Sequence, residues 1–485
     1  MASGICLKVL VDKKKNKVVF AECDHDFVDV LFSFLTMPIG TIMRLASTKS
    51  LTVGIGCMSN LYKSIENIDV QHFPNQACRT MLLSPRNGAE SHCKKLKLKI
   101  DDAQASVFFV CSSSECTSSK FKLLSYYSYV PCDCGASMYH GIYLSETSSV
   151  NGGVFVKATD RFIVSDDLQV MLLCTATSFS LLSKCGVIDG STIEERTFTL
   201  GVNEVLSLLI CSLVSSTPLT ETLLKQKPVP ELNNVVLYNQ GRSAKSQVEK
   251  QMMGEDQSMH IKLKLFVSKS QKMVCYAEAK KDFVNLLFSL LTVPLGHIVK
   301  QVYDSSLKLK GCLDHLYKSL QDLDEQCFKS NYHKEILVAP RVAPGFRYEN
   351  DLLGIQEAPH QWYYYQDRYG NKNLDANKTP CPYMGIGPIP LRVVHSKSHD
   401  KEEKNRGGFL LGPNLFTVTD NLIIKPISPI LGLSILNELK VPFGDIEERT
   451  VHVGKEEALS LLLSSFVSES ALTNAFIRDH TQRQW

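Results

Sequence analysis

The sequence contains no apolar segment long enough to cross a membrane as a helix, which takes about 18 residues with few or no charges. Its most apolar stretch, residues 27–45, contains Asp29 and Arg44 and is interrupted by Pro38 and Gly40. The start of the chain also lacks the basic region, apolar run and small-residue cleavage site of a secretion signal. These absences predict a cytoplasmic or nuclear protein without a membrane span.

A strong charge of either sign is missing as well. The 485 residues include 53 Lys and Arg and 50 Asp and Glu, which gives a formal net charge of +3. Such a balance does not suggest nucleic-acid binding by bulk electrostatics. The one basic run, residues 13–17, is best explained as a solvated hairpin turn. With 44% hydrophobic residues, the chain is an ordinary globular sequence, too long for a single core.

The usual signatures of catalysis are also absent. Neither H-E-x-x-H nor G-x-S-x-G occurs. The glycine pairs 152–153 and 407–408 come before predicted strands, whereas a phosphate-binding loop leads from a strand into a helix. The sequence therefore offers no catalytic residue and no binding motif for an organic cofactor, and an enzyme is not the favoured interpretation.

What the sequence does contain is a long internal repeat. The offset between matching residues drifts only from 256 (26 to 282) to 253 (193 to 446), which indicates a duplicated unit of roughly 225 residues. We predict a first module at 1–224, a polar flexible linker at 225–258 and a second module at 259–485. The main matching pairs are DFVDVLFSFLTMPIGTI with DFVNLLFSLLTVPLGHI, GCMSNLYKSI with GCLDHLYKSL, MLLSPR with ILVAPR, and IEERTFTLGVNEVLSLL with IEERTVHVGKEEALSLL.

The periodicity predicts an α+β fold, with a mostly antiparallel sheet in each module covered by helices on one face. Strands are expected in a hairpin over 5–22, at an edge over 93–102, and within 161–170 and 195–201. Helices are expected to start near residues 26, 56, 170 and 203. A weaker similarity between 18–38 and 196–218 leaves open whether each module arose from two half-repeats.

The most closely repeated segment predicts a core helix, not a catalytic site. Its apolar residues recur at helical spacing: Phe27, Val30, Leu31, Phe34 and Leu35. Asp24 or Asp26 suits the helix N-terminus, Pro38 suits its end, and Gly40 suits a left-handed cap.

Two cysteines occupy matching positions in the repeat, Cys57 and Cys312. His315 in the second copy corresponds to Asn60 in the first, so no base accompanies both thiols. We therefore predict that both cysteines are small buried apolar side chains and not nucleophiles.

One group of residues has the pattern of a chemical site. The first module contains a Cys-rich insert at 108–138, in which Cys111, Cys116, Cys132 and Cys134 form two close pairs. Two such pairs on either side of a hairpin-length segment are typical of a structural zinc site, and Gly135 suits the tight turn after the second pair. The alternative is a Cys-rich surface loop without an ion. The corresponding segment of the second module, 362–387, keeps only Cys381, so that the fold itself does not require a metal.

These motifs together resemble the plant domain-of-unknown-function 674 family. The resemblance covers nearly the whole chain, once per module, through LKVLVDKKKNKVVFAE, DFVDVLFSFLTMPIGTI, GCMSNLYKS, CDCG and TPLTETLL. It implies a protein of land plants with tandem copies of one domain, and no activity or ligand is established for the family. The Cys motif is shared with other members, which supports zinc in the first module, whereas the second module departs from it.

The favoured interpretation is a non-enzymatic binding or scaffold protein with protein partners and one structural zinc ion. Two alternatives belong to other classes of function. One is an enzyme with an unrecognised active site in a cleft between the modules. The other is a thiol redox sensor that uses Cys132 and Cys134.

Overall fold

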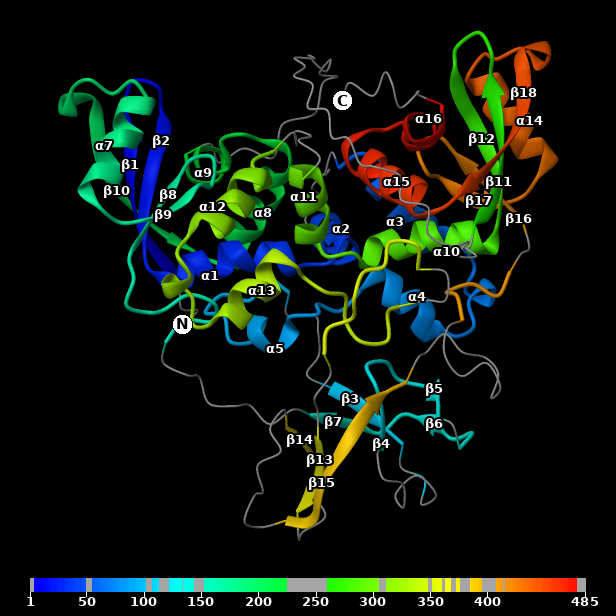
Figure 1. Ribbon diagram of the computed structural model, residues 1–485, viewed down its shortest axis with the longest axis horizontal. Helices are drawn as coiled ribbons and strands as arrows, with labels where there is room; N and C mark the ends of the chain where they lie inside the picture. The colour runs from blue at the N-terminus through cyan, green and yellow to red at the C-terminus, as the bar shows by residue number, and fades with distance from the viewer. Residues whose placement is uncertain are drawn as a thin grey trace, which may run out of the picture.

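The computed structural model of the protein is a mixed α+β structure with three main sheets (Figure 1). The predicted linker 225–258, Cys116 and Cys381 lie outside the residues that it describes. Within the described part of the chain, no helix is long and apolar enough to cross a membrane. The described residues are 4–48, 55–101, 107–111, 113, 122–132, 134–143, 152–224, 260–304, 311–347, 351–359, 363–367, 372–375, 384–394, 407–412 and 415–477.

Two of the sheets have five antiparallel strands and equivalent strand orders, β10-β1-β2-β8-β9 and β18-β11-β12-β16-β17. The first sheet contains β1 Ile5–Asp12, β2 Lys17–Cys23, β8 Phe162–Ser165, β9 Val170–Leu172 and β10 Ile193–Leu200. The second contains β11 Ile261–Ser268, β12 Met273–Lys280, β16 Leu415–Thr419, β17 Ile424–Pro426 and β18 Ile446–Val453. The predicted antiparallel sheets are therefore present, and their origin by duplication stays a prediction.

The predicted first hairpin is formed by β1 and β2, and alternation explains it. The residues of β1 that face the core are fully buried and those between them are not: Ile5, Leu7, Val9 and Val11 alternate with Cys6, Lys8 and Leu10, which are exposed or half-buried. Asn16 in the turn has a φ of 46°, a conformation that asparagine tolerates better than most residues.

Helices of both halves of the chain lie between and around these sheets. Residues 4–224 (the first half) contain α1 His25–Ser33, α2 Ile39–Thr48, α3 Met58–Asn67, α4 Gln76–Leu83, α5 Glu90–Cys93, α7 Thr175–Lys184, α8 Val202–Val214 and α9 Pro218–Leu223, with 3-10 turns η1 Phe34–Thr36, η2 Val70–His72 and η3 Gly190–Thr192. Residues 260–477 (the second half) contain α10 Lys281–Ser289, α11 Leu295–Asp304, α12 Leu313–Asp322, α13 Asn331–Val338, α14 Pro429–Glu438, α15 Lys455–Val467 and α16 Ala471–Phe476, with 3-10 turns η4 Leu290–Thr292, η5 Glu325–Cys327 and η6 Phe443–Asp445.

The repeated core helix is confirmed. The five apolar residues of the predicted stripe are fully buried, and the Asp24 carboxylate accepts the Asp26 amide as an N-cap. The prediction for Gly40 was wrong: it lies inside α2 and not in a left-handed cap. A Cβ at this position would lie 2.7 Å from the Leu82 carbonyl oxygen, so close packing against α4 explains the glycine.

The two halves cross where these repeated segments end. The Ile39 amide donates to the Val293 carbonyl at 3.1 Å, and the Leu295 amide donates to the Met37 carbonyl at 2.8 Å. Pro38 and Pro294, which match in the repeat, form an antiparallel bridge. Each half thus passes directly against the equivalent segment of the other half.

Beyond this crossing, the halves exchange helices. Helix α3 of the first half packs against β17 and α10 of the second, whereas α12 of the second half packs against β9 and α1 of the first. The Ser64 hydroxyl of α3 accepts the Ile424 amide of β17, and the Ser319 hydroxyl of α12 accepts the Val170 amide of β9, both at 2.9 Å. One continuous apolar core therefore contains residues of both halves.

Three sequence-based expectations were wrong in detail. Residues 93–101 form no strand, although Leu96, Leu98 and Ile100 alternate with exposed lysines, because their packing on the core replaces backbone pairing. The helix expected near 170 begins at Thr175, after β9. Helices also cover both faces of each large sheet, since α7 and α14 pack on the outer faces.

The third sheet is shared between the halves and lies at the far end of the molecule (Figure 1). Its order is β14-β13-β15-β4-β3-β7, and the pairing of β15 with β4 is parallel, with Leu391 opposite Lys122. The Lys122 ammonium lies 4.1 Å from the centre of the Tyr364 ring across the same junction. The strands are β3 Val107–Val110, β4 Lys122–Ser125, β7 Gly141–Tyr143, β13 Tyr363–Asp367, β14 Lys372–Asp375 and β15 Met384–Val393, and a separate small hairpin contains β5 Val130–Pro131 and β6 Ser137–Met138.

The helix exchange predicts that neither half forms a native monomer alone. Fragments 1–224 and 259–485, produced together, are expected to co-purify as a one-to-one complex, because each supplies a helix to the other's core. Size-exclusion chromatography with mass determination measures this. Two monomeric fragments, each with its own cooperative unfolding transition and no mutual affinity, would contradict the exchange.

An ion pair at one of the two exchanged helices predicts a pH dependence. His315 Nδ1 of α12 lies 3.0 Å from Asp167 Oδ2, which raises the pKa of His315. Burial opposes ionisation of Asp167, but its bonds with His315 and Ser165 lower the pKa of this carboxyl to about 2. The ion pair stabilises the fold fully at pH values between the ordinary pKa of an aspartate and that of a histidine, where both groups are charged in the unfolded chain as well. It is lost as pH rises through the raised pKa of His315 or falls towards 2.

We expect His315→Asn to lower the free energy of unfolding by about 0.3–1 kcal/mol at pH 5 and by less at pH 9, because both side chains are partly exposed and screened. Urea unfolding at both pH values measures the change. At the equivalent position Asn60 donates to the Asn421 carbonyl, so Asn60→Ala is the matched control without pH dependence. Equal losses at pH 5 and pH 9 for His315→Asn would contradict the ion pair.

Candidate metal centre

Three of the four predicted zinc ligands lie together at the edge of the third sheet. Cys111 follows β3, and Cys132 and Cys134 lie in the turn between β5 and β6. Their sulfur atoms are all within 4.8 Å of one another, and Cys111 Sγ lies 3.6 Å from Cys134 Sγ. Within the described ranges, this is the one group of three His, Cys, Asp or Glu residues placed closely enough to hold a metal ion.

The turn that carries Cys132 and Cys134 is held by its own backbone. The Gly135 amide donates to the Cys132 carbonyl and the Cys132 amide donates to the Ala136 carbonyl, both at 2.8 Å. Gly135 has a φ of +85°, which other residues rarely adopt. The predicted tight turn at Gly135 is confirmed, and it directs two thiols toward the same side as Cys111.

The thiols are enclosed by apolar side chains. Cys111 and Cys132 are buried among residues of the small hairpin, the third sheet and helix α4: Ala77, Leu123, Val130 and Met138. Ala77 connects this cluster to α4, which also belongs to the main body. An ion held here would therefore fix the small hairpin, the third sheet and the main body to one another.

The other cysteines singled out from the sequence are placed as predicted. Cys57 and Cys312 are fully buried at the N-termini of the exchanged helices. Burial raises the pKa of Cys57 to about 12 and that of Cys312 well above its ordinary value. Both thiols are thus neutral at physiological pH, and neither is an activated nucleophile.

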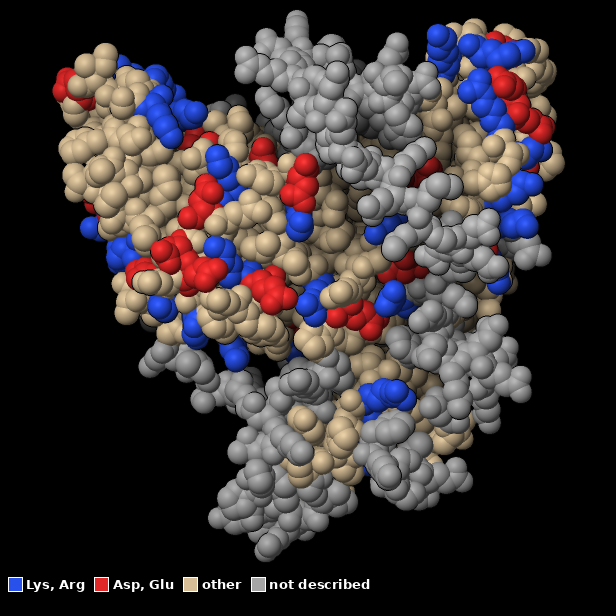
Figure 2. Space-filling model, viewed as in Figure 1, with Lys and Arg blue, Asp and Glu red and all other residues tan. Residues whose placement is uncertain are grey.

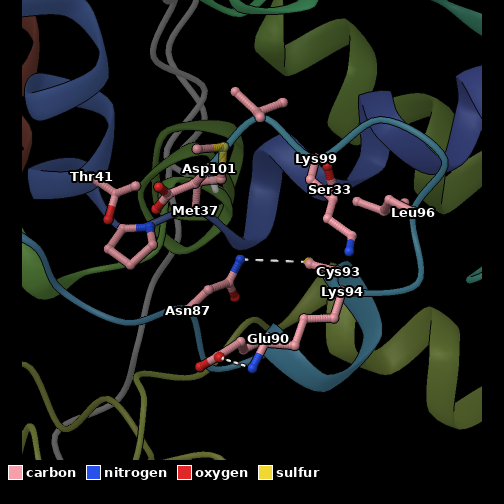
Figure 3. A pocket seen from close by; sticks show the side chains of 12 residues that line it. Ser33, Met37, Thr41, Asn87, Glu90, Cys93, Lys94, Leu96, Lys99 and Asp101 are labelled. Atoms are coloured by element: carbon pink, nitrogen blue, oxygen red, sulfur yellow. Dashed lines mark hydrogen bonds and ion pairs between the residues drawn. The ribbon is translucent and has the colours of Figure 1, made fainter. Parts of the chain in front are cut away.

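A second feature, which the sequence did not indicate, is a cavity of about 160 Å³ between α1, α2 and residues 87–101 (Figure 3). Figure 3 shows Asn87, Glu90, Cys93 and Lys94 on its wall. Asn87 Nδ2 donates to Thr36 Oγ1 at 2.9 Å and lies 3.6 Å from Cys93 Sγ. Burial raises the pKa of the Cys93 thiol to about 12. Ligand pockets usually measure roughly 300–1,000 Å³, and these polar groups bond to the protein itself, so we assign the cavity no ligand.

Beside this cavity lies a buried group of charges. The Arg86 guanidinium donates to both carboxylate oxygens of Glu90, at 2.8 and 2.6 Å, and Lys94 Nζ lies 2.5 Å from Glu90 Oε1. Arg86 also lies over the rings of Phe108 and Tyr126, which belong to the third-sheet region. Burial opposes ionisation of Glu90, but the charge of Arg86 outweighs it and lowers the pKa of this carboxyl.

This charge cluster holds the third sheet against the main body, and the sequence analysis missed it. The signal was present in the spacing Arg86-x3-Glu90-x3-Lys94, which on a helix would place opposite charges one turn apart, although α5 begins only at Glu90. The equivalent arginine of the repeat, Arg341, pairs with Glu335 at the surface instead.

The comparisons with known proteins show the family and no function. A family model described as a protein of unknown function, DUF674, matches residues 2–456. No curated protein and no solved structure matches the chain.

The buried charge cluster predicts a large and position-specific loss of stability. Glu90→Gln removes the negative charge between Arg86 and Lys94 and leaves a buried guanidinium without its counterion, at a cost of about 3 kcal/mol. Glu335→Gln is the matched control, because the Arg341–Glu335 pair is exposed and worth at most about 1 kcal/mol. Chemical unfolding of the full chain measures both. Equal losses in the free energy of unfolding for the two substitutions would show that burial does not increase the stabilising effect of the Arg86–Glu90 pair.

Proposed function

Because this chain belongs to the DUF674 family, whose description assigns no activity, we propose from the geometry that it is a non-enzymatic binding or scaffold protein stabilised by one structural zinc ion. The ligands are Cys111, Cys132 and Cys134, with Cys116 as the fourth. The close approach of the first three sulfur atoms carries this proposal.

The sulfur separation fits a zinc thiolate site. A tetrahedral ion with Zn–S bonds of about 2.3 Å places its sulfur atoms about 3.8 Å apart. Cys111 Sγ and Cys134 Sγ are 3.6 Å apart, far longer than a disulfide bond of about 2.05 Å. Thiolate sulfur is a ligand that zinc binds in structural sites, and the three thiols lie together among apolar side chains.

The same ligand set supports a structural role for the ion. Four thiolates fill the coordination sphere of zinc and leave no position for a catalytic water. The ion would join the turn at Cys132 and Cys134 to β3, in the sheet where the two halves of the chain pair through β4 and β15. We therefore propose that it stabilises the junction of the halves and takes no part in a reaction.

A cytoplasmic or nuclear location and protein partners belong to the same proposal. The fourteen cysteines that the structure describes form no disulfide, which supports a reducing compartment. Two interlocked halves with equivalent sheets present similar surfaces twice, and this supports binding of a partner at two places.

The redox-sensor alternative was predicted for Cys132 and Cys134, and the sulfur pair that lies 3.6 Å apart in the structure is Cys111 with Cys134. Sulfur atoms 3.6 Å apart need only a small movement to form a disulfide, with two electrons passing to an oxidant such as a peroxide. The two alternatives differ in an observable way, because a metal-bound thiolate is protected from alkylation until a chelator removes the ion.

We expect freshly reduced full-length protein, purified without added metal, to contain about one zinc ion per chain by elemental analysis. A Cys132→Ser/Cys134→Ser variant should lose the ion and exchange amide hydrogens faster in β3 and β4, while the two five-stranded sheets keep their protection. A Cys6→Ser/Cys174→Ser variant, which removes two exposed thiols elsewhere, should keep the ion.

Absence of metal from the reduced wild-type protein would overturn the zinc proposal. If a Cys111–Cys134 disulfide then formed on mild oxidation, the redox-sensor alternative would replace it.

A further inference from the structure

Exposed large apolar side chains gather at two equivalent places on the described surface. In each half they surround the helix on the outer face of a five-stranded sheet, α7 or α14. Single exposed apolar residues are normal on a protein surface, whereas groups of them mark interaction sites. The residues are Leu172, Leu173, Phe179 and Ile188 in the first half and Leu415, Ile427, Ile430, Leu433 and Phe443 in the second.

A lysine-rich turn adjoins one end of the first of these places. Lys15 Nζ of the turn donates to the Cys185 carbonyl at 2.7 Å, next to the loop that carries Ile188. Ile188 is 100% exposed and Phe179 is 66% exposed, whereas Leu172 lies at the opposite end of the sheet. We call the end with the lysine turn the first tip, which comprises residues 13–16 and 179–192.

The second half repeats the arrangement with different residues. The Lys269 amide donates to the Asp445 carbonyl at 3.0 Å, so the turn that bears Lys269 and Lys272 adjoins η6. Phe443 of η6 is 65% exposed and Leu433 of α14 is 48% exposed. This end is the second tip, which comprises residues 269–272 and 433–445.

Acidic groups also lie at the tips, and Asp12 Oδ2 is 3.8 Å from Lys15 Nζ, so part of the lysine charge is balanced. Asp189 accepts the Ser191 amide at 3.0 Å, and Glu194 pairs with Arg196 at 2.5 Å. At the second tip the Asp445 carboxylate accepts the Ser270 amide at 3.0 Å. The lysines of both turns are exposed, so their charge faces solvent.

Both tips point to the same side of the molecule. In Figure 1 the β1–β2 and β11–β12 turns lie at the two upper corners, away from the third sheet. Figure 2 shows Lys and Arg side chains at both corners, together with some Asp and Glu side chains. One flat surface could therefore meet both tips at once.

We propose that the two tips bind an anionic lipid surface, with the lysines at the headgroups and the exposed aliphatic and aromatic side chains in the interfacial layer. The tips combine the two attractions that hold peripheral proteins on such membranes, lysine charge and shallow apolar insertion. They are convex ends of a sheet and helix, and Ile188 protrudes completely, which suits insertion better than the flat, well-packed contact typical of a protein partner.

Co-sedimentation of the full chain with phosphatidylcholine vesicles, with and without 30% phosphatidylserine, tests this. We expect binding only to the anionic vesicles and a decrease with added salt. Lysine contributes roughly fivefold to partitioning at such a surface. Lys13→Gln/Lys14→Gln/Lys15→Gln should therefore weaken binding by at least about tenfold. Ile188→Ser/Phe179→Ser at the first tip and Leu433→Ser/Phe443→Ser at the second should each weaken it as well.

Matched control variants distinguish binding through the tips from a general attraction of the protein's charged or apolar surface to the vesicles. Lys95→Gln/Lys99→Gln removes exposed lysines near α5, and Tyr332→Ser removes a half-exposed aromatic residue of α13; both should bind as the wild type does. The proposal is overturned if the wild-type protein ignores anionic vesicles or if the controls lose binding equally. It is also overturned if the tip variants instead convert a dimer of this chain to a monomer without any vesicle binding.

Discussion

The structure depends on one constraint, which is that neither five-stranded sheet buries its inner face with the helices of its own half alone. Helix α3 crosses to the second sheet and α12 crosses to the first, and serine hydroxyls at matching positions satisfy the amides of β17 and β9. The crossing at Pro38 and Pro294 brings the two halves close enough for this exchange. The core that results is common to both halves, so their stability is expected to be cooperative.

Within this common frame the two halves differ in chemistry. Arg86 is buried with Glu90 beneath the third sheet, whereas the matching Arg341 pairs at the surface. Asp29 accepts the amides of residues 154–156, and the matching Asn285 accepts one amide, that of Leu410. A fold held by backbone hydrogen bonds and apolar packing tolerates such differences, because each of these polar residues contacts only its near neighbours. Chemistry present in one half alone, such as the cysteine cluster, is therefore compatible with the shared fold.

The sequence predicted what depends on local periodicity. The alternation in β1, the stripe from Phe27 to Leu35 and the burial of Cys57 all follow from residues close together in the chain. The stripe on α3 shows that one face is buried but not which half buries it, so the exchange was not predictable. The alternation at 95–100 predicted a strand for the same reason, because pairing depends on a distant partner.

The cysteine cluster was predicted because spacing of a few residues constrains where thiols can lie, and Cys111, Cys132 and Cys134 do meet. The position of the cluster in the molecule was not predicted, since it depends on the parallel pairing of β4 with β15 of the other half. That placement separates the two proposed functions in space. The third sheet lies at one end and the lysine-bearing tips at the other (Figure 1). Loss of the metal should therefore loosen the junction of the halves and leave the shape and charge of the tips unchanged.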